Sequence, residues 1–69
     1  MYFEVYPTEE QEGPGLLASL VPRWRWRLKA DNNETIASGE AYNSKQSCLH
    51  AVELIRATTK DTPVKEVGL

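Results

Sequence analysis

The sequence is poor in residues that cross-link a chain or anchor it in a membrane. Cys48 is its one cysteine, so no disulfide can form within the chain, and a lone thiol fits a reducing compartment. No apolar run reaches the roughly 18 residues of a membrane-spanning helix. Residues 1 to 4 carry no basic side chain, which is unlike a signal peptide. We therefore expect a soluble cytoplasmic protein that does not bind membranes.

Residues that could carry out catalysis or hold a metal are also few. Cys48 and the single histidine, His50, are two positions apart in a predicted helix, so they point to different sides and form neither a metal site nor a thiol–imidazole pair. The glycines at 13 and 15 lack the lysine and the spacing of a phosphate-binding loop. The acidic residues at 9, 10 and 12 have no neighbour suited to general acid–base work. We therefore expect that the protein is not an enzyme and that it binds neither a metal nor a cofactor.

Length and charge set further limits. A chain of 69 residues forms one domain, 1–69, and a domain of this size buries only about 60% of its unfolded surface. Hydrophobic residues make up 41% of the chain and charged residues 26%, a balance typical of globular proteins. The formal net charge of -2 argues against strong nonspecific binding to nucleic acid or to anionic membranes.

What the sequence does contain is an uninterrupted alternation over residues 23–30. The residues on one side are Trp24, Trp26, Leu28 and Ala30, and those on the other are Arg23, Arg25, Arg27 and Lys29. Successive side chains of a strand point to opposite faces, so the stretch predicts a β-strand with one buried and one solvated face. The two tryptophans are therefore expected in the core rather than as a base-stacking pair.

Two further strands are predicted around this one. Residues 1–6 alternate, with Phe3 and Val5 on one face, and Pro7 ends the strand. Residues 31–34 form a turn rich in Asn and Asp, and residues 35–38 form a third strand with Ile36 facing inward. Gly39 permits a bulge or bend.

The hydrophobic period then changes to that of a helix from about Ser44 to Thr59 or Lys60, capped by Asn43 or Ser44. The predicted apolar stripe consists of Cys48, Ala51, Val52, Ile55 and Thr59, with Leu49 at its edge. Pro63 blocks continuation, and residues 64–67 form either a short edge strand or a loose tail. The predicted fold is α+β, with a three-stranded antiparallel sheet packed on one C-terminal helix in the order β-β-β-α.

Residues 7–22 are predicted to form a long loop insertion. The first part is acidic and rich in Pro and Gly. The second part contains four large apolar residues, Leu16, Leu17, Leu20 and Val21. Because connections normally run over the surface, these side chains either pack on the chain's own sheet, as a flap or a helical turn, or form a patch that contacts another chain.

Three pieces of the sequence together resemble a known family. They are the Trp24–Ala30 strand, the series Asn33, Ile36, Ala37, Ser38, Glu40 and Tyr42, and Ser44-Lys45 opening a helix that contains Cys48. This combination is similar to the YegP-like family of small uncharacterised prokaryotic proteins. The resemblance covers roughly residues 1–6 and 23–67. It implies a β-β-β-α unit that pairs with a second copy, and it implies no catalytic residues. The sixteen residues between the first two strands and the presence of Gly39 depart from the family pattern.

The basic side of the 23–30 strand admits three interpretations. The face can be solvated, with cross-strand carboxylates such as Glu4 balancing its charge. It can bind anions or nucleic acid, with Tyr2 and Tyr6 as stacking platforms. It can also contact a protein, since arginine and tyrosine are common interface anchors. The candidate contact face comprises Arg23, Arg25, Arg27, Lys29, Tyr2 and Tyr6.

The sequence therefore predicts a small non-enzymatic interaction module that forms a homodimer. A chain this short, without a disulfide or a metal, gains stability most readily by association. The candidate dimer contact comprises Leu16, Leu17, Leu20 and Val21. The alternative is weak binding of RNA or single-stranded DNA through the basic face.

Overall fold

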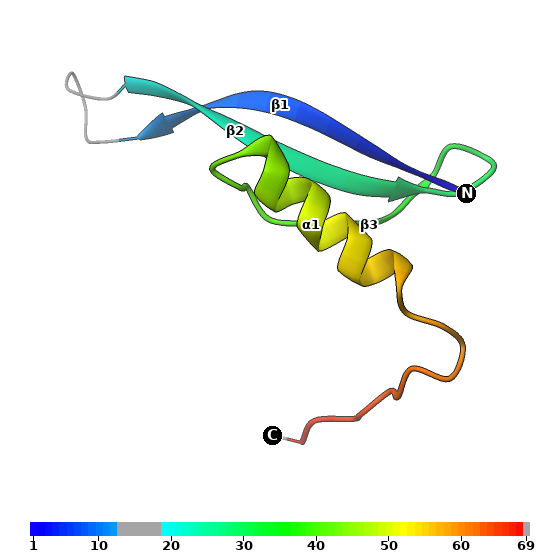
Figure 1. Ribbon diagram of the computed structural model, residues 1–69. Helices are drawn as coiled ribbons and strands as arrows, with labels where there is room; N and C mark the ends of the chain where they lie inside the picture. Colours follow the sequence, from blue (N-terminus) through cyan, green and yellow to red (C-terminus); the bar gives the residue numbers. More distant parts are fainter. Residues whose placement is uncertain (13–18, 69) are drawn as a thin grey trace.

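In the computed structural model, which describes residues 1–12 and 19–68, three strands form one antiparallel sheet and a single helix crosses one face of it (Figure 1). The elements are β1 (Tyr2–Glu12), β2 (Ser19–Lys29), β3 (Thr35–Ser38) and α1 (Lys45–Arg56). The sheet order is β1-β2-β3, so β2 is central. The predicted α+β fold, in the order β-β-β-α, is confirmed.

The strands β1 and β2 form a long hairpin whose far half extends beyond the helix, and we call residues 7–12 and 19–22 the hairpin arm (Figure 1). Pairing runs from Tyr2 opposite Lys29 to Glu12 opposite Ser19 without a break in register. The predicted facing of the strands is confirmed, because Phe3, Val5 and Leu28 pack against the buried core.

The predicted end of the first strand at Pro7 is wrong, and so is the predicted loop over 7–12 and 19–22. The backbone N–H of Trp24 donates to the Tyr42 carbonyl, and the Trp24 carbonyl accepts from the Tyr42 N–H, both at 2.8 Å. The backbone N–H and C=O groups of Trp24 therefore point away from β1. Pro7 lies opposite Trp24 in the ladder, and its nitrogen therefore faces the open edge of the sheet. An edge strand tolerates proline there, because no ladder hydrogen bond is lost.

The predicted turn at 31–34 is confirmed, and Asn33 adopts the left-handed conformation with φ of 68°. The inward position predicted for Ile36 is wrong. Leu28 pairs with Ala37 and Lys29 pairs with Thr35, so Ile36 is the extra residue of a bulge and its side chain is 54% exposed.

The helix α1 begins after Ser44, whose hydroxyl accepts a hydrogen bond from the Ser47 N–H at 3.1 Å, as predicted for one of the two candidate caps. It ends at Arg56, earlier than predicted. The Thr58 hydroxyl donates to the Ile55 carbonyl at 2.6 Å, and this bond replaces the next turn of the helix. Leu49, predicted at the edge of the apolar stripe, is 41% exposed.

The core is centred on one indole ring. Among the described residues, the buried hydrophobic side chains are Trp26, Cys48 and Val52. Half-buried residues around them are Phe3, Val5, Trp24, Leu28, Tyr42, Ala51 and Ile55. Phe3 meets Trp26 edge-on, with ring centroids 5.9 Å apart. The predicted placement of the tryptophans in the core is confirmed.

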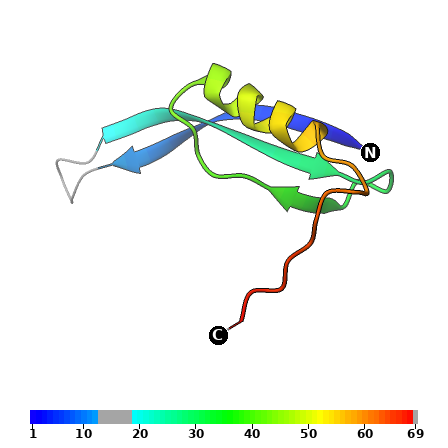
Figure 2. The same cartoon turned by 60° about the horizontal axis from the view of Figure 1, so that its bottom comes forward.

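Residues 57–68 form a tail that leaves the body of the molecule, and Figures 1 and 2 both show it running away from the sheet and the helix. The side chain of Val64 is 98% exposed, and no strand is formed within 57–68. Of the two alternatives for 64–67, the structure thus has the loose tail. None of the helical segments within 1–12 and 19–68 has the length and hydropathy required to cross a bilayer.

Candidate interaction surfaces

The side of the sheet that faces away from α1 carries the predicted row of cations, which we call the cationic face (Arg23, Arg25, Arg27 and Lys29). These residues alternate along β2 with the side chains that pack on the core. Opposite them on β1 lie Thr8, Tyr6, Glu4 and Tyr2. The face is therefore built from two strands, and its acidic partners come from β1.

Arg25 and Arg27 of this face are held in ion pairs. Arg27 Nε donates to Glu4 Oε1 at 2.6 Å, and Arg25 donates to Glu10. Hydrogen bonding to these carboxylates raises the pKa of both guanidinium groups, so both stay charged. The expected cross-strand role of Glu4 is confirmed. Glu10 was missed because it was placed in a loop, although the alternation of β1 continues past Pro7.

The two tyrosines predicted as stacking platforms already have partners. The Arg27 guanidinium carbon lies 4.6 Å from the centre of the Tyr6 ring, which is a cation–π contact. The Tyr2 hydroxyl donates to Asn33 Oδ1 at 2.8 Å. A nucleic-acid base would have to displace Arg27 before it could stack on that face of Tyr6.

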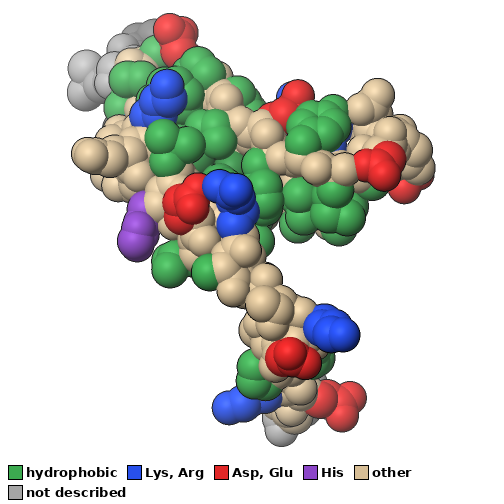
Figure 3. All heavy atoms as spheres, turned by 45° about the vertical axis from the view of Figure 1, so that its right-hand side comes forward, with side chains coloured by type: hydrophobic (Ala, Val, Ile, Leu, Met, Phe, Trp, Pro, Cys, Tyr) green, Lys and Arg blue, Asp and Glu red, His purple; other side chains and the backbone are tan. Residues whose placement is uncertain are grey.

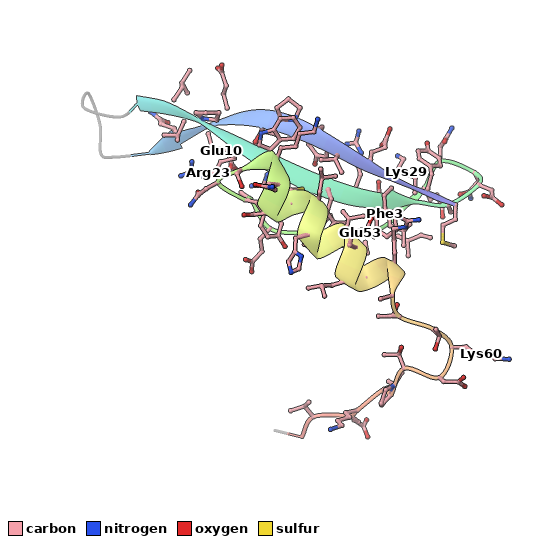
Figure 4. All side chains as sticks on the ribbon, in the orientation of Figure 1. Phe3, Glu10, Arg23, Lys29, Glu53 and Lys60 are labelled. Carbon is pink, nitrogen blue, oxygen red and sulfur yellow. The ribbon has the colours of Figure 1, made fainter. Side chains whose placement is uncertain are left out.

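The residues at the two ends of the cationic face also make polar contacts. Arg23 Nη1 donates to the Pro22 carbonyl at 3.1 Å, and Lys29 Nζ lies 3.4 Å from Thr35 Oγ1. Figure 4 shows Arg23 and Glu10 toward the hairpin-arm end of the sheet and Lys29 near the opposite end. The arrangement is a mixed surface of alternating charge rather than an uninterrupted cationic track.

Two apolar hollows flank the helix, one on each side. The first, which we call the β1 groove, has a volume of about 700 Å³. Its lining includes Met1, Phe3, Val5, Leu49, Val52 and Ile55. The second has a volume of about 570 Å³ and lies between α1 and Tyr42, with His50 and Leu54 in its wall. Hydrophobic side chains, green in Figure 3, reach the surface over much of the side shown.

The predicted dimer patch is only partly described by the structure. Leu16 and Leu17 lie outside the described residues. Leu20 is 66% exposed and Val21 is half-buried. Because these two are consecutive in β2, their side chains point to opposite faces of the hairpin arm. A single flat partner surface therefore does not reach both.

Cys48 and His50 are separated as predicted. The Cys48 side chain is fully buried, and this burial raises the pKa of its thiol. His50 is on the exposed surface of α1. Within 1–12 and 19–68, no cluster of three or more His, Cys, Asp or Glu side chains could hold a metal ion.

The fold is that of a small β-β-β-α domain with an apolar groove and a charged sheet face. The chain belongs to the DUF1508 family, a domain of unknown function, whose model matches residues 22–66. It is 52% identical over 67 residues to a UPF0339 protein of Neisseria meningitidis serogroup B, covering 97% of this chain and 100% of the relative. A UPF0339 protein of Treponema denticola is 51% identical over 45 residues, covering 65% of this chain and 78% of the relative. The YegP-like resemblance is thereby confirmed.

The extent of these matches bears on the hairpin arm. The family model begins at Pro22 and so leaves out β1. The alignment with the Neisseria relative spans 97% of the chain and must therefore take in most of β1 and the hairpin arm. The long first hairpin, expected to be a departure from the family, thus falls within a region of similarity to at least one relative.

Proposed function

We propose that this protein is a small non-enzymatic interaction module whose working form is a homodimer. The observation that carries the proposal is the imbalance between buried and exposed apolar side chains. Three hydrophobic residues are buried among those described. The exposed large aliphatic residues are Leu20, Ile36, Leu49, Leu54, Val64 and Val67. A domain of this size, stabilised by so small a core, gains from covering such residues with a second copy.

The edges of the sheet support the same proposal. Among the described residues, β1 and β3 are the edge strands of the sheet, and each presents backbone groups that no other described strand pairs with. Unpaired strand edges favour association with another strand. Two-fold pairing of identical chains is the commonest closed form of association.

The non-enzymatic part of the proposal rests on the character of the surfaces. The β1 groove is lined mainly by aliphatic and aromatic side chains, and the charged residues at its wall, Glu53 and Arg56, bond to each other at 2.8 Å. The thiol of Cys48 is enclosed in the core, away from any substrate. Such surfaces suit protein contact better than chemistry.

The cationic face supports the nucleic-acid alternative less well. Arg25 and Arg27 are each ion-paired with a carboxylate, so a phosphate group would have to compete with Glu10 and Glu4. The formal net charge of -2 also opposes a polyanion.

Size-exclusion chromatography with light scattering tests the homodimer directly. At micromolar concentration the mass should be twice the 7.8 kDa of the chain. The melting temperature should rise with protein concentration, because association stabilises the folded state by mass action. A protein that stays at 7.8 kDa over the whole concentration range and melts at a constant temperature is incompatible with the proposal.

A further inference from the structure

We propose that the side of α1 that faces away from the β1 groove, together with the helix side of β3, is a docking site for an amphipathic α-helix of a partner protein. The partner helix has an apolar stripe that is flanked by carboxylates. The site includes the hollow between α1 and Tyr42, which we call the outer hollow. None of the described residues that line the outer hollow also lines the β1 groove, so the site does not depend on the proposed homodimer.

The first support is that one helix cannot cover three strands. An α-helix is about 10–12 Å across and neighbouring strands lie about 4.8 Å apart, so a helix that runs along a sheet covers about two of them. The helix α1 packs on β1 and β2, and within the described chain it makes no close backbone approach to β3 (Figure 2). The helix layer of this two-layer fold therefore stops short of β3.

The strand β3 shows the consequence of this gap. All four of its residues are exposed, although successive side chains point to opposite faces of the sheet. Ala37 lies opposite Leu28, whose side chain packs on the core, so Ala37 faces the helix side. Ile36, the extra residue of the bulge, is 54% exposed. Apolar side chains of β3 are thus left in solvent, because no element of the described chain lies over them.

The second support is the outer hollow, which lies on the same side of α1 as this gap. Tyr42 pairs with Trp24 on the side of β2 that faces away from β1, which is the side of β3. Gln46, His50 and Leu54 follow at intervals of four residues along α1, so the helical wall of the outer hollow is about 12 Å long. This length fits about two turns of a docked helix.

The wall of the outer hollow has the composition of a binding groove. Ala51 and Leu54 supply apolar surface, and Leu54 is 60% exposed. Within the described chain, the Tyr42 hydroxyl, the Gln46 amide and the His50 ring have no hydrogen-bond partner, so all three are available to another molecule. Apolar grooves with a few convergent polar groups are typical binding sites, and amphipathic helices dock in such grooves through one apolar face.

The third support is charge, which favours an acidic partner. No acidic side chain is among the described residues that line the outer hollow, Glu40 included, and the first turn of α1 has none. Lys45 is exposed at that end of α1, with its ammonium 5.4 Å from the centre of the Trp24 ring. Glu53 is bonded to Arg56 at the β1 groove. Carboxylates on a docked helix therefore meet Lys45 and the positive end of the helix dipole rather than like charge.

Titration of the full ¹⁵N-labelled chain with two synthetic peptides tests the proposal by NMR. The first is an amphipathic peptide of about 16 residues, with leucine on one face and glutamate on the other, and the second has lysine in place of each glutamate. The basic peptide should bind at least about tenfold more weakly than the acidic one. The acidic peptide should shift the amide resonances of Ala37, Tyr42, Gln46, His50 and Leu54.

Three substitutions locate the contact. Leu54→Lys removes apolar surface from the outer hollow and should weaken the acidic peptide by about tenfold or more. Lys45→Glu should weaken the acidic peptide and strengthen the basic one. Leu49→Lys is the matched control, because Leu49 is an exposed leucine on the β1 side of α1, and it should leave the affinity unchanged. All three side chains are exposed, so the variants should fold.

The outcomes separate this site from the proposed homodimer. One acidic peptide should bind per chain whether the protein is a monomer or a dimer. A monomer that binds the acidic peptide in this way therefore overturns the homodimer and supports the site. No resonance shift at peptide concentrations on the order of millimolar overturns the site. Loss of binding in Leu49→Lys but not in Leu54→Lys also overturns it, and equal affinity for both peptides overturns the acidic partner.

Discussion

A single methyl group added at Gly39 should destabilise this fold through one steric contact. Gly39 follows β3, and its N–H donates to the Trp26 carbonyl at 3.1 Å. A Cβ atom built there would overlap Nε1 and Cε2 of the Trp26 indole and lie 2.6 Å from Cδ1, a distance that real Cβ contacts essentially never show. The indole is 7% exposed and packs edge-on against Phe3, so it has little room to move.

The expected cost of Gly39→Ala follows from this geometry. Overpacking a filled core costs about 1–3 kcal/mol. The free energy of unfolding of a 69-residue domain is about 3.5–10 kcal/mol, at roughly 0.05–0.15 kcal/mol per residue. The substitution should therefore remove a large share of the stability. The melting temperature should fall by about 4–8 °C for each kcal/mol lost.

Urea unfolding at a fixed protein concentration measures this cost. Gly68→Ala is the matched control, because a Cβ at Gly68 meets nothing within 4 Å. The cost should shrink when Gly39→Ala is made in a Trp26→Phe background, since phenylalanine lacks the indole nitrogen, and the double-mutant cycle isolates this coupling. Equal stability of Gly39→Ala and Gly68→Ala, or a cost unaffected by Trp26→Phe, would refute the steric explanation.

Three further predictions concern the core, the thiol and the cationic face. Trp26→Ala should cost about 3–5 kcal/mol in chemical denaturation, and a loss below about 1 kcal/mol would contradict the central place of this side chain. Burial raises the pKa of Cys48 above its unfolded value of 9.0. The stability that the fold gains from burying the neutral thiol is therefore complete below pH 9 and is lost as the pH rises further. When the pH is raised above 9, the free energy of unfolding measured in urea should therefore fall more for the wild type than for Cys48→Ala. If the cationic face does bind single-stranded oligonucleotides, anisotropy should show affinity falling by roughly 0.7 log units per log unit of salt for each phosphate contacted, and Arg25→Glu/Arg27→Glu should abolish it. Equal binding by both proteins excludes this face.

The elements that could be predicted from the sequence are those in which a long periodic pattern marks one apolar face that packs on the core. The alternation over 23–30 gave the facing of β2 correctly, because both tryptophans can be buried only if the cations are solvated. The stripe through Cys48 and Val52 likewise predicted the face of α1 that the sheet covers. In each case several residues agree on one orientation.

Errors occurred where the outcome depends on a neighbouring strand. The sequence predicts that the first strand ends at Pro7. A proline ends a strand only if its nitrogen faces a partner strand, and the local sequence does not specify the strand order. Ile36 was placed inward because the pattern of four residues cannot reveal a bulge against β2. Glu10, the ion-pair partner of Arg25, could not be predicted because it lies in the part of β1 that follows Pro7.

The β1 groove could not be predicted either, although its residues were assigned to the correct elements. Phe3, Val5 and Leu49 were all expected in the core, and a helix that covered the whole sheet would have buried them. One helix of twelve residues lies over β1 and β2 and leaves a strip beside β1 uncovered. The width of that strip depends on where the helix lies over the sheet, which no local pattern specifies.

The start of the chain and the end of the helix line the same groove. Met1 and Tyr2 share its wall with Arg56 and Thr58, so the polypeptide begins and leaves its last element at one corner of the domain. The twelve residues of 57–68 could span about 40 Å when extended. Two copies could therefore be fused head to tail with this segment as the linker and without displacing β1 or α1. If the protein is the homodimer proposed above, such a fusion would turn the association of two copies into an intramolecular step, at an effective concentration on the order of millimolar, so that dilution would not separate the two halves.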